Sequence, residues 1–196
     1  MLDASHACSH FQGQGSADMP DWSKGISNMN RSDSTQGMAA LETPTDLGSD
    51  AAKRISTILN ALLADMFALH MKTKNFCWHM SGPNFRELHL LLDEHAENIF
   101  AATDNIARRV RKLGGLTLHS IGDVSRRQRL LDNDSDYVPP RQMLTDLRDD
   151  NLQLAAFLRE THGICEEHGD VATARLLEGW IDDAEQRVWH LFEVCR

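Results

Sequence analysis

Apolar residues recur at intervals of three and four along four long stretches of the chain, which is the spacing that places them on one face of an α-helix. In the first stretch, Ile55, Leu59, Leu62, Met66 and Leu69 show this spacing. No Val/Ile/Thr-rich alternating run typical of a β-strand stands out. The pattern therefore predicts an all-α protein with helices over residues 49–79, 84–113, 139–168 and 171–194.

Glycine and proline separate the predicted helices. Ser81-Gly82-Pro83 is expected to end the first helix and Gly114-Gly115 the second, because glycine favours helix C-termini and proline cannot continue a helix. Gly169-Asp170 is expected to join the last two helices as a C-cap followed by an N-cap. Either Ser49 or Asp50 is expected to cap the first helix.

The second and third helices are joined by a long connection, residues 116–138, in which residues 123–131 are expected to form a short helix. A long connection can return the chain to the opposite end of a bundle, so that the two helices it joins run parallel. The predicted fold is a four-helix bundle with one long crossover that carries a short extra helix. This is the ferritin-like arrangement.

Residues 1–48 lack this periodicity and are rich in Ser, Gly, Asp, Asn and Met, which predicts a disordered tail ahead of one domain over 49–196. The first 50 residues carry seven acidic and two basic side chains, so the tail is acidic. His6, Cys8 and His10 form a cluster that could bind zinc or copper loosely. We favour an incidental cluster, because a flexible segment does not hold a preformed site.

The chain has 196 residues and a formal net charge of −9, which argues against a generally basic nucleic-acid binder. No apolar run of about 18 residues predicts a membrane span, and the first residues lack a secretory signal pattern. Four widely separated cysteines favour free thiols and a cytoplasmic location. The basic runs 108–112 and 126–129 are interpreted as solvated or ion-paired faces rather than phosphate contacts.

Ionisable residues follow helical spacing along the second predicted helix. His89, Asp93, Glu97, Asp104 and Arg108 are separated by four, four, seven and four residues, and therefore share one broad stripe. The stripe overlaps the apolar face, so part of it is expected to be buried or at an interface. Imidazole and carboxylate groups in this arrangement suit iron(II), manganese(II) or zinc(II). The spacing alone fits a solvated carboxylate–arginine pair equally well.

The string from Lys74 to His89, KNFCWHMSGPNFRELH, resembles the signature of the Dps family, the DNA-protection-during-starvation proteins or mini-ferritins. Asp93 and Asp104 extend the resemblance, and the helix pattern carries it over residues 50–194. It implies a subunit of a hollow twelve-subunit shell that oxidises iron(II), preferably with hydrogen peroxide, and stores the ferric mineral. Some members bind DNA through lysine-rich tails, but the tail of this chain is acidic.

The resemblance also implies a ferroxidase site shared between two subunits. His89 matches the second histidine ligand, Asp93 the first carboxylate, and Asp104 the aspartate supplied by the partner subunit. Two positions depart from the family pattern, because Cys77 stands where the family has its first histidine and Arg108 stands where it has a glutamate.

The Arg108 substitution replaces an anionic ligand with a fixed cation, whereas the Cys77 thiol could still bind metal but would be open to oxidation. Two mechanisms follow from these departures. In one, His89, Asp93 and Asp104 still bind metal weakly and oxidation is slow. In the other, which we favour, Arg108 pairs with Asp93 or Asp104 at the subunit interface and closes the former site. A shell without enzymatic activity, or a DNA-associated stress protein, is the alternative function.

Three acidic residues, Asp146, Asp149 and Asp150, cluster near the start of the third predicted helix. In a shell, they could line a threefold pore and concentrate cations. An acidic helix start that complements the helix dipole explains them equally well.

Overall fold

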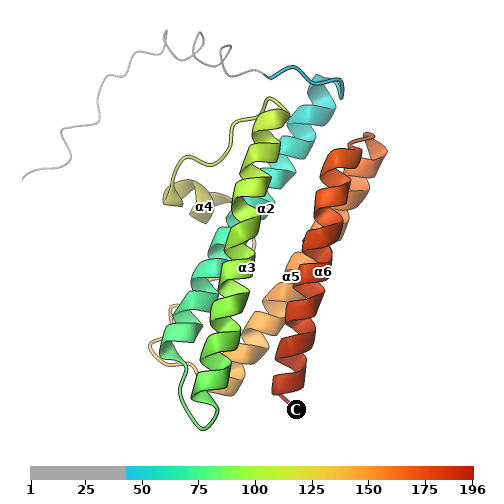
Figure 1. The fold of residues 1–196 in the computed structure, drawn as a ribbon. Helices are drawn as coiled ribbons and strands as arrows, with labels where there is room; N and C mark the ends of the chain where they lie inside the picture. Colours follow the sequence, from blue (N-terminus) through green and yellow to red (C-terminus); the bar gives the residue numbers. More distant parts are fainter. Residues whose placement is uncertain (1–42) are drawn as a thin grey trace, which may run out of the picture. The chain divides into compact units, whose positions relative to one another are not determined.

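The computed structural model describes residues 43–196, and every structural statement below concerns that part of the chain. It is built from helices alone, and the predicted all-α class is confirmed. The helices are α2 (Ser49–His79), α3 (Phe85–Lys112), α4 (Ile121–Arg127), α5 (Pro140–Glu167) and α6 (Val171–Val194) (Figure 1). The predicted tail lies almost wholly outside the described residues, and so does the His6, Cys8 and His10 cluster.

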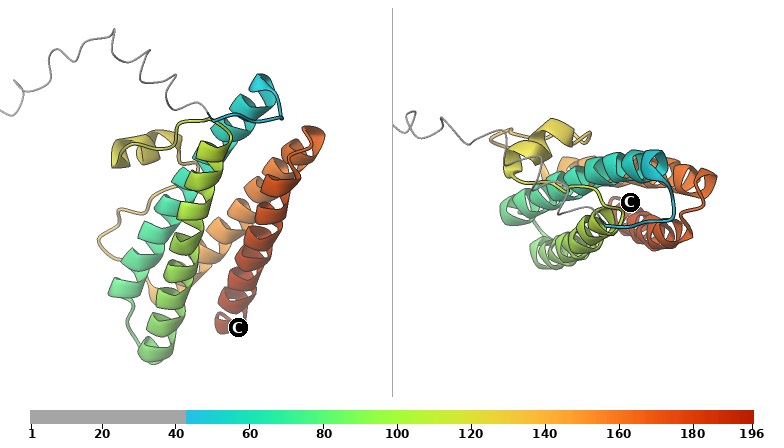
Figure 2. Two further views of the ribbon diagram at one scale, coloured as in Figure 1. Left: turned by 45° about the horizontal axis from the view of Figure 1, so that its top comes forward. Right: turned by 90° about the horizontal axis from the view of Figure 1, so that it is seen from above.

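The long helices form a bundle in which consecutive helices pair. Helix α2 packs against α3 and α5, and α6 packs against α5 and α3. Figures 1 and 2 show that α3 returns antiparallel to α2 and that the crossover then carries the chain back, so that α5 runs parallel to α3. The predicted crossover topology is therefore confirmed. The short helix α4 lies against the outer side of α2.

Two details of the helix ends differ from the sequence prediction. The N-cap of α2 is Gly48, at φ 77°, and no side chain caps this helix. The crossover helix begins at Ile121, two residues earlier than expected, because the Ser120 hydroxyl accepts a hydrogen bond from the Asp123 amide and caps it there. The expected junction at Gly169 and Asp170 is confirmed, since Asp170 caps α6 through the Thr173 amide.

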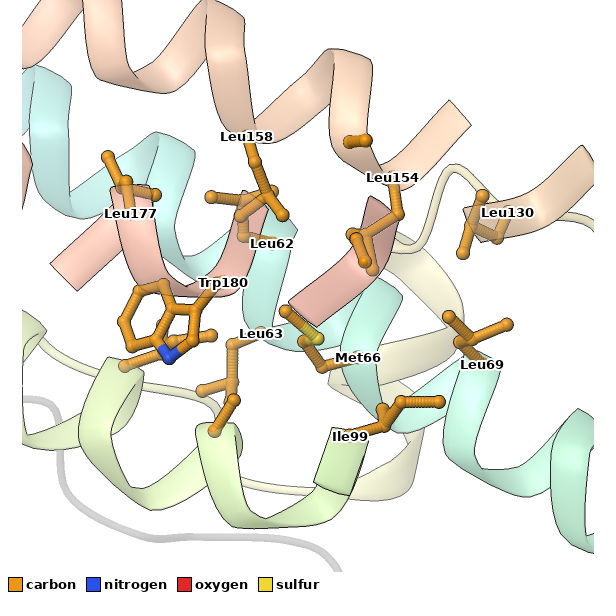
Figure 3. Close-up of a cluster of buried hydrophobic side chains, with 14 of the residues drawn as sticks. Leu62, Leu63, Met66, Leu69, Ile99, Leu130, Leu154, Leu158, Leu177 and Trp180 are labelled. Carbon is orange, nitrogen blue, oxygen red and sulfur yellow. The ribbon is translucent and has the colours of Figure 1, made fainter. Parts of the chain in front are cut away.

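The core lies between the four long helices, and the predicted apolar faces supply it. Figure 3 shows side chains from α2, α3, α5 and α6 pointing toward one another around Met66 and Trp180, with Leu130 of the crossover beside them. Leu62, Met66 and Leu154 are almost completely buried. This burial is the main force that stabilises the bundle, because removing apolar surface from water is the dominant favourable term in folding.

The crossover is fixed to α2 by a buried ion pair. The Asp65 carboxylate is inaccessible to solvent and accepts hydrogen bonds from the backbone amide, Nε and Nη2 of Arg129 at 2.6, 2.9 and 2.6 Å. The Arg129 guanidinium also lies over the Phe157 ring. Arg129 belongs to the basic run 126–129, and for this residue the prediction of an ion pair is confirmed. None of the described helices is long and apolar enough to span a membrane.

Candidate functional site

Two of the three predicted metal ligands, His89 and Asp93, lie where the end of α2 faces the first half of α3, whereas Asp104 lies in the second half of α3. Helix α2 ends at His79, the chain turns through Gly82 at φ 106°, and α3 begins at Phe85. The positive φ at Gly82 is strained for any residue with a Cβ, so glycine suits this turn. The tight turn brings side chains of the last turns of α2 beside those of the first turns of α3.

Cys77 and His89 contact each other across this turn. The Cys77 Sγ lies 3.3 Å from His89 Nδ1, and the same ring nitrogen lies 3.1 Å from the Cys77 carbonyl oxygen. The Cys77 side chain is completely buried, and burial raises the pKa of its thiol although Lys74 opposes the shift. Cys77 is therefore a protonated thiol at neutral pH, and in that form it is a poor metal ligand.

Asp93 is engaged by Lys74, which the sequence analysis did not single out. The Lys74 ammonium on α2 lies 2.5 Å from the Asp93 carboxylate on α3. The hydrogen bond lowers the pKa of Asp93 and raises that of Lys74, because each partner stabilises the charged form of the other. The two residues are 19 positions apart, so the pair becomes visible only once the antiparallel packing of α2 on α3 is known.

Asp104 and Arg108 form an ion pair on the exposed face of α3. The Arg108 Nε lies 2.6 Å from the Asp104 carboxylate, and about 70% of each side chain is exposed in the single chain. The solvated pair that the i, i+4 spacing allowed is therefore present within one subunit. Asp104 and Arg108 point away from the core, so this end of the stripe is not its buried part. Their exposure leaves them available for an interface.

The remaining ionisable candidates lie apart from this group. His79 bonds the carbonyl of Asn75 in its own helix, and Glu97 is exposed. Among the described residues, no three His, Cys, Asp or Glu side chains of one chain are arranged to hold a metal ion. His89, Asp93 and Asp104 therefore do not make up a complete site within a single subunit.

The three aspartates proposed for a pore have different surroundings. Asp150 is largely buried and pairs with Lys72 of α2 at 2.7 Å, and burial raises its pKa. Asp146 accepts a hydrogen bond from Gln142 at 2.6 Å, and Asp149 pairs with Arg148. Only Asp149 is freely exposed in the single chain. Pore lining stays a prediction, since it concerns the assembled shell.

Comparison with known proteins places the chain in a family. A ferritin-like domain model matches residues 56–196. A low temperature-induced protein of Nostoc is 34% identical over 146 residues, which cover 74% of this chain and 82% of the relative. A DNA protection during starvation protein of Agrobacterium fabrum is 31% identical over 154 residues, covering 79% of this chain and 95% of the relative.

Solved structures agree with the sequence comparisons. DpsC from Streptomyces coelicolor superimposes with a TM-score of 0.76 at 28% identity, covering 79% of this chain and 91% of that chain. A Dps homologue from Halobacterium salinarum superimposes with a TM-score of 0.72 at 29% identity, covering 75% of this chain and 82% of that chain. The similarity thus extends over the whole helical bundle. From its fold, its turn motif and these relatives, we conclude that the chain belongs to the Dps family of ferritin-like proteins.

Proposed function

We propose that this chain is a subunit of a Dps-type shell that sequesters iron and whose ferroxidase centre is weakened. The observation that carries the proposal is the pairing of Arg108 with Asp104, at the position where a second carboxylate is expected. A guanidinium is always charged and cannot bind a metal ion, so it repels the iron(II) substrate from this carboxylate.

The other two candidate ligands are engaged as well. Asp93 is held by the Lys74 ammonium, and His89 contacts a thiol that burial keeps protonated. Iron(II) would therefore have to displace Lys74 to reach Asp93. These competing contacts support weak binding by His89 and Asp93 from one subunit and Asp104 from a second copy.

The site is shared between subunits in the proposal, and two copies therefore have to meet along α2 and α3. Large apolar side chains are exposed beside the candidate ligands, among them Trp78, Phe85 and Leu90. Exposed apolar surface of this kind is typical of protein interfaces. Light scattering on the purified protein tests assembly, and a mass of twelve subunits is the expected result.

Iron oxidation tests the weakened centre. Iron(II) is added anaerobically, peroxide is introduced, and ferric absorbance is followed in the wild type and in the double variant Arg108→Glu with Cys77→His. We expect slow oxidation in the wild type and at least a tenfold increase in the double variant, because local charge falls by two units and two ligands are restored.

The matched control is Arg108→Gln with Cys77→Ser, which removes the cation and the thiol without supplying ligands. Its rate should lie close to that of the wild type. A wild type that oxidises iron as fast as the double variant contradicts the proposal.

The second candidate function is a shell without ferroxidase chemistry. The same contacts that weaken metal binding, those of Lys74, Cys77 and Arg108, also support this function. Iron retained per shell after anaerobic iron(II) loading and a subsequent addition of peroxide separates the two functions, because a store keeps the ferric iron that forms and an inert shell does not. Association with DNA through the basic runs has less support, since Arg109 and Arg129 are committed to Asp170 and Asp65.

A further inference from the structure

A polar hollow lies at the other end of the bundle from the α2–α3 turn. It has a volume of about 600 Å³ and lies between the first turns of α2, the turn at Gly114-Gly115 and the end of α4. Lys53, Ser56, Asn60 and Arg127 are among the residues that line it, and none of the described lining residues is acidic.

Two buried polar atoms in the wall of this hollow have no partner. The Ser56 Oγ and the Asn60 Oδ1 make no hydrogen bond, although each residue is only 6% exposed. The Asn60 amide group is already oriented, because its Nδ2 donates to the Leu116 carbonyl at 2.8 Å. The Ser56 side chain packs against the turn, because it occupies the space that a Cβ at Gly115 would need, only 2.6 Å from Ser56 Oγ. Buried polar atoms are normally satisfied, so this pair indicates a ligand that supplies both an acceptor and a donor.

The hollow is also positively charged. Lys53 and Arg127 are exposed and make no ion pair with any described residue. The first turn of α2 adds backbone amides, because Gly48 lines the hollow and no side chain caps this helix of 31 residues. Uncapped helix N-termini attract anions, although Asp50 in the same turn offsets part of the charge.

We propose that this hollow is a binding site for hydrogen phosphate. Lys53 and Arg127 supply the cations, and the Ser56 hydroxyl donates to a phosphate oxygen. Asn60 Oδ1 accepts the proton that inorganic phosphate keeps at neutral pH. Sulfate and the phosphodiesters of DNA carry no such proton, so each would leave the Asn60 acceptor unpaired and bind more weakly.

Calorimetric titration of the full-length, metal-free protein with inorganic phosphate tests the site. One saturable phosphate per chain is expected, and sulfate should bind at least about tenfold more weakly, the usual cost of an unpaired buried acceptor. Ser56→Ala and Arg127→Gln should each weaken phosphate binding by about tenfold. The control is Arg141→Ala, which removes an exposed arginine that lies outside the hollow and should leave affinity unchanged.

Arg127→Gln changes only an exposed side chain, so its result is interpretable even if Ser56→Ala impairs folding. The proposal is overturned if phosphate does not bind, if sulfate binds as tightly, or if Arg127→Gln and Arg141→Ala have equal effects. Displacement of phosphate by a short DNA duplex at matched phosphate concentration would also overturn it, because the hollow would then bind phosphodiesters. Since no iron is present, the result is independent of the proposed ferroxidase chemistry.

Discussion

Lys74 of α2 holds the carboxylate of Asp93 of α3 through a contact of 2.5 Å between its Nζ and Oδ1. Both pKa shifts have the same cause, since the hydrogen bond raises the pKa of Lys74 and lowers that of Asp93. The ammonium thus occupies a position beside a candidate iron ligand that a metal ion would otherwise take. In the proposed function, this pair is a second obstacle to metal binding, separate from Arg108.

Removing this ammonium should strengthen metal binding. Lys74→Met removes the charge and keeps an unbranched apolar side chain, so the Asp93 carboxylate becomes available to a cation. We expect cobalt(II) to bind about tenfold more tightly, which corresponds to about 1.4 kcal/mol, when measured by calorimetry. Lys112→Met, at the other end of α3, is the matched loss of one lysine and should have no effect. Equal affinities in the wild type and Lys74→Met would contradict this role.

The cysteines of the bundle should differ sharply in reactivity. Cys77 and Cys165 are completely buried, and burial raises the pKa of both thiols, that of Cys165 to about 12. Cys195, after the end of α6, is partly exposed. Alkylation with iodoacetamide at pH 7.5, followed by peptide mass spectrometry, should label Cys195 within minutes and the other two only after unfolding. Rapid labelling of Cys77 in the native protein would show that its environment is more open than the structure indicates.

Most of the fold could be predicted from the sequence because the apolar period is regular. Within each long helix the core positions recur every three or four residues, as Leu59, Leu62 and Met66 do in α2. The ends of the helices carry glycine or proline. The cap of α2 could not be predicted, because Gly48 takes the role without any side-chain hydrogen bond. The start of α4 depended on a single hydroxyl, that of Ser120.

The candidate site was predictable only in part. Spacing along one helix placed Asp104 beside Arg108, and the structure confirms their contact. Contacts between helices were not predictable in the same way, because they depend on how far one helix is shifted along the other. Lys74 with Asp93 and Asp65 with Arg129 are both of this kind. In each pair the two residues belong to different segments of the chain, so helical spacing does not predict that they are in contact.

The buried ion pair between α2 and the crossover should matter for stability. Asp65→Asn removes the buried carboxylate that pairs with the part-buried Arg129, and breaking a buried pair costs about 3 kcal/mol. The expected fall in melting temperature is about 6–12 °C, measured by calorimetry at fixed subunit concentration. Arg126→Ala, which removes an exposed guanidinium paired with Asp123 within the same short helix, is the control and should cost under about 1 kcal/mol. Similar losses in the two variants would argue against a special role for the buried pair.

Stability should decrease below neutral pH because of His95. This side chain is buried on α3, its Nε2 lies 3.3 Å from His190 Nδ1 on α6, and Arg187 of α6 adds a nearby positive charge. Burial, followed by Arg187 and His190, lowers the pKa of His95 from 6.5 to about 3. Between those values the unfolded chain binds one more proton than the folded chain, so the free energy of unfolding falls as pH falls.

A measurement at two pH values isolates this contribution. Between pH 7.5 and 5.5 the wild type should lose about 1.4 kcal/mol more than His95→Gln, since a single group contributes up to about 1.4 kcal/mol per pH unit. Denaturant unfolding at fixed subunit concentration gives the difference. His119→Gln, which removes an exposed histidine, should retain the wild-type pH dependence. If His95→Gln shows the same loss as the wild type, then His95 is protonated in the folded bundle, and the stacked pair with His190 tolerates a charge.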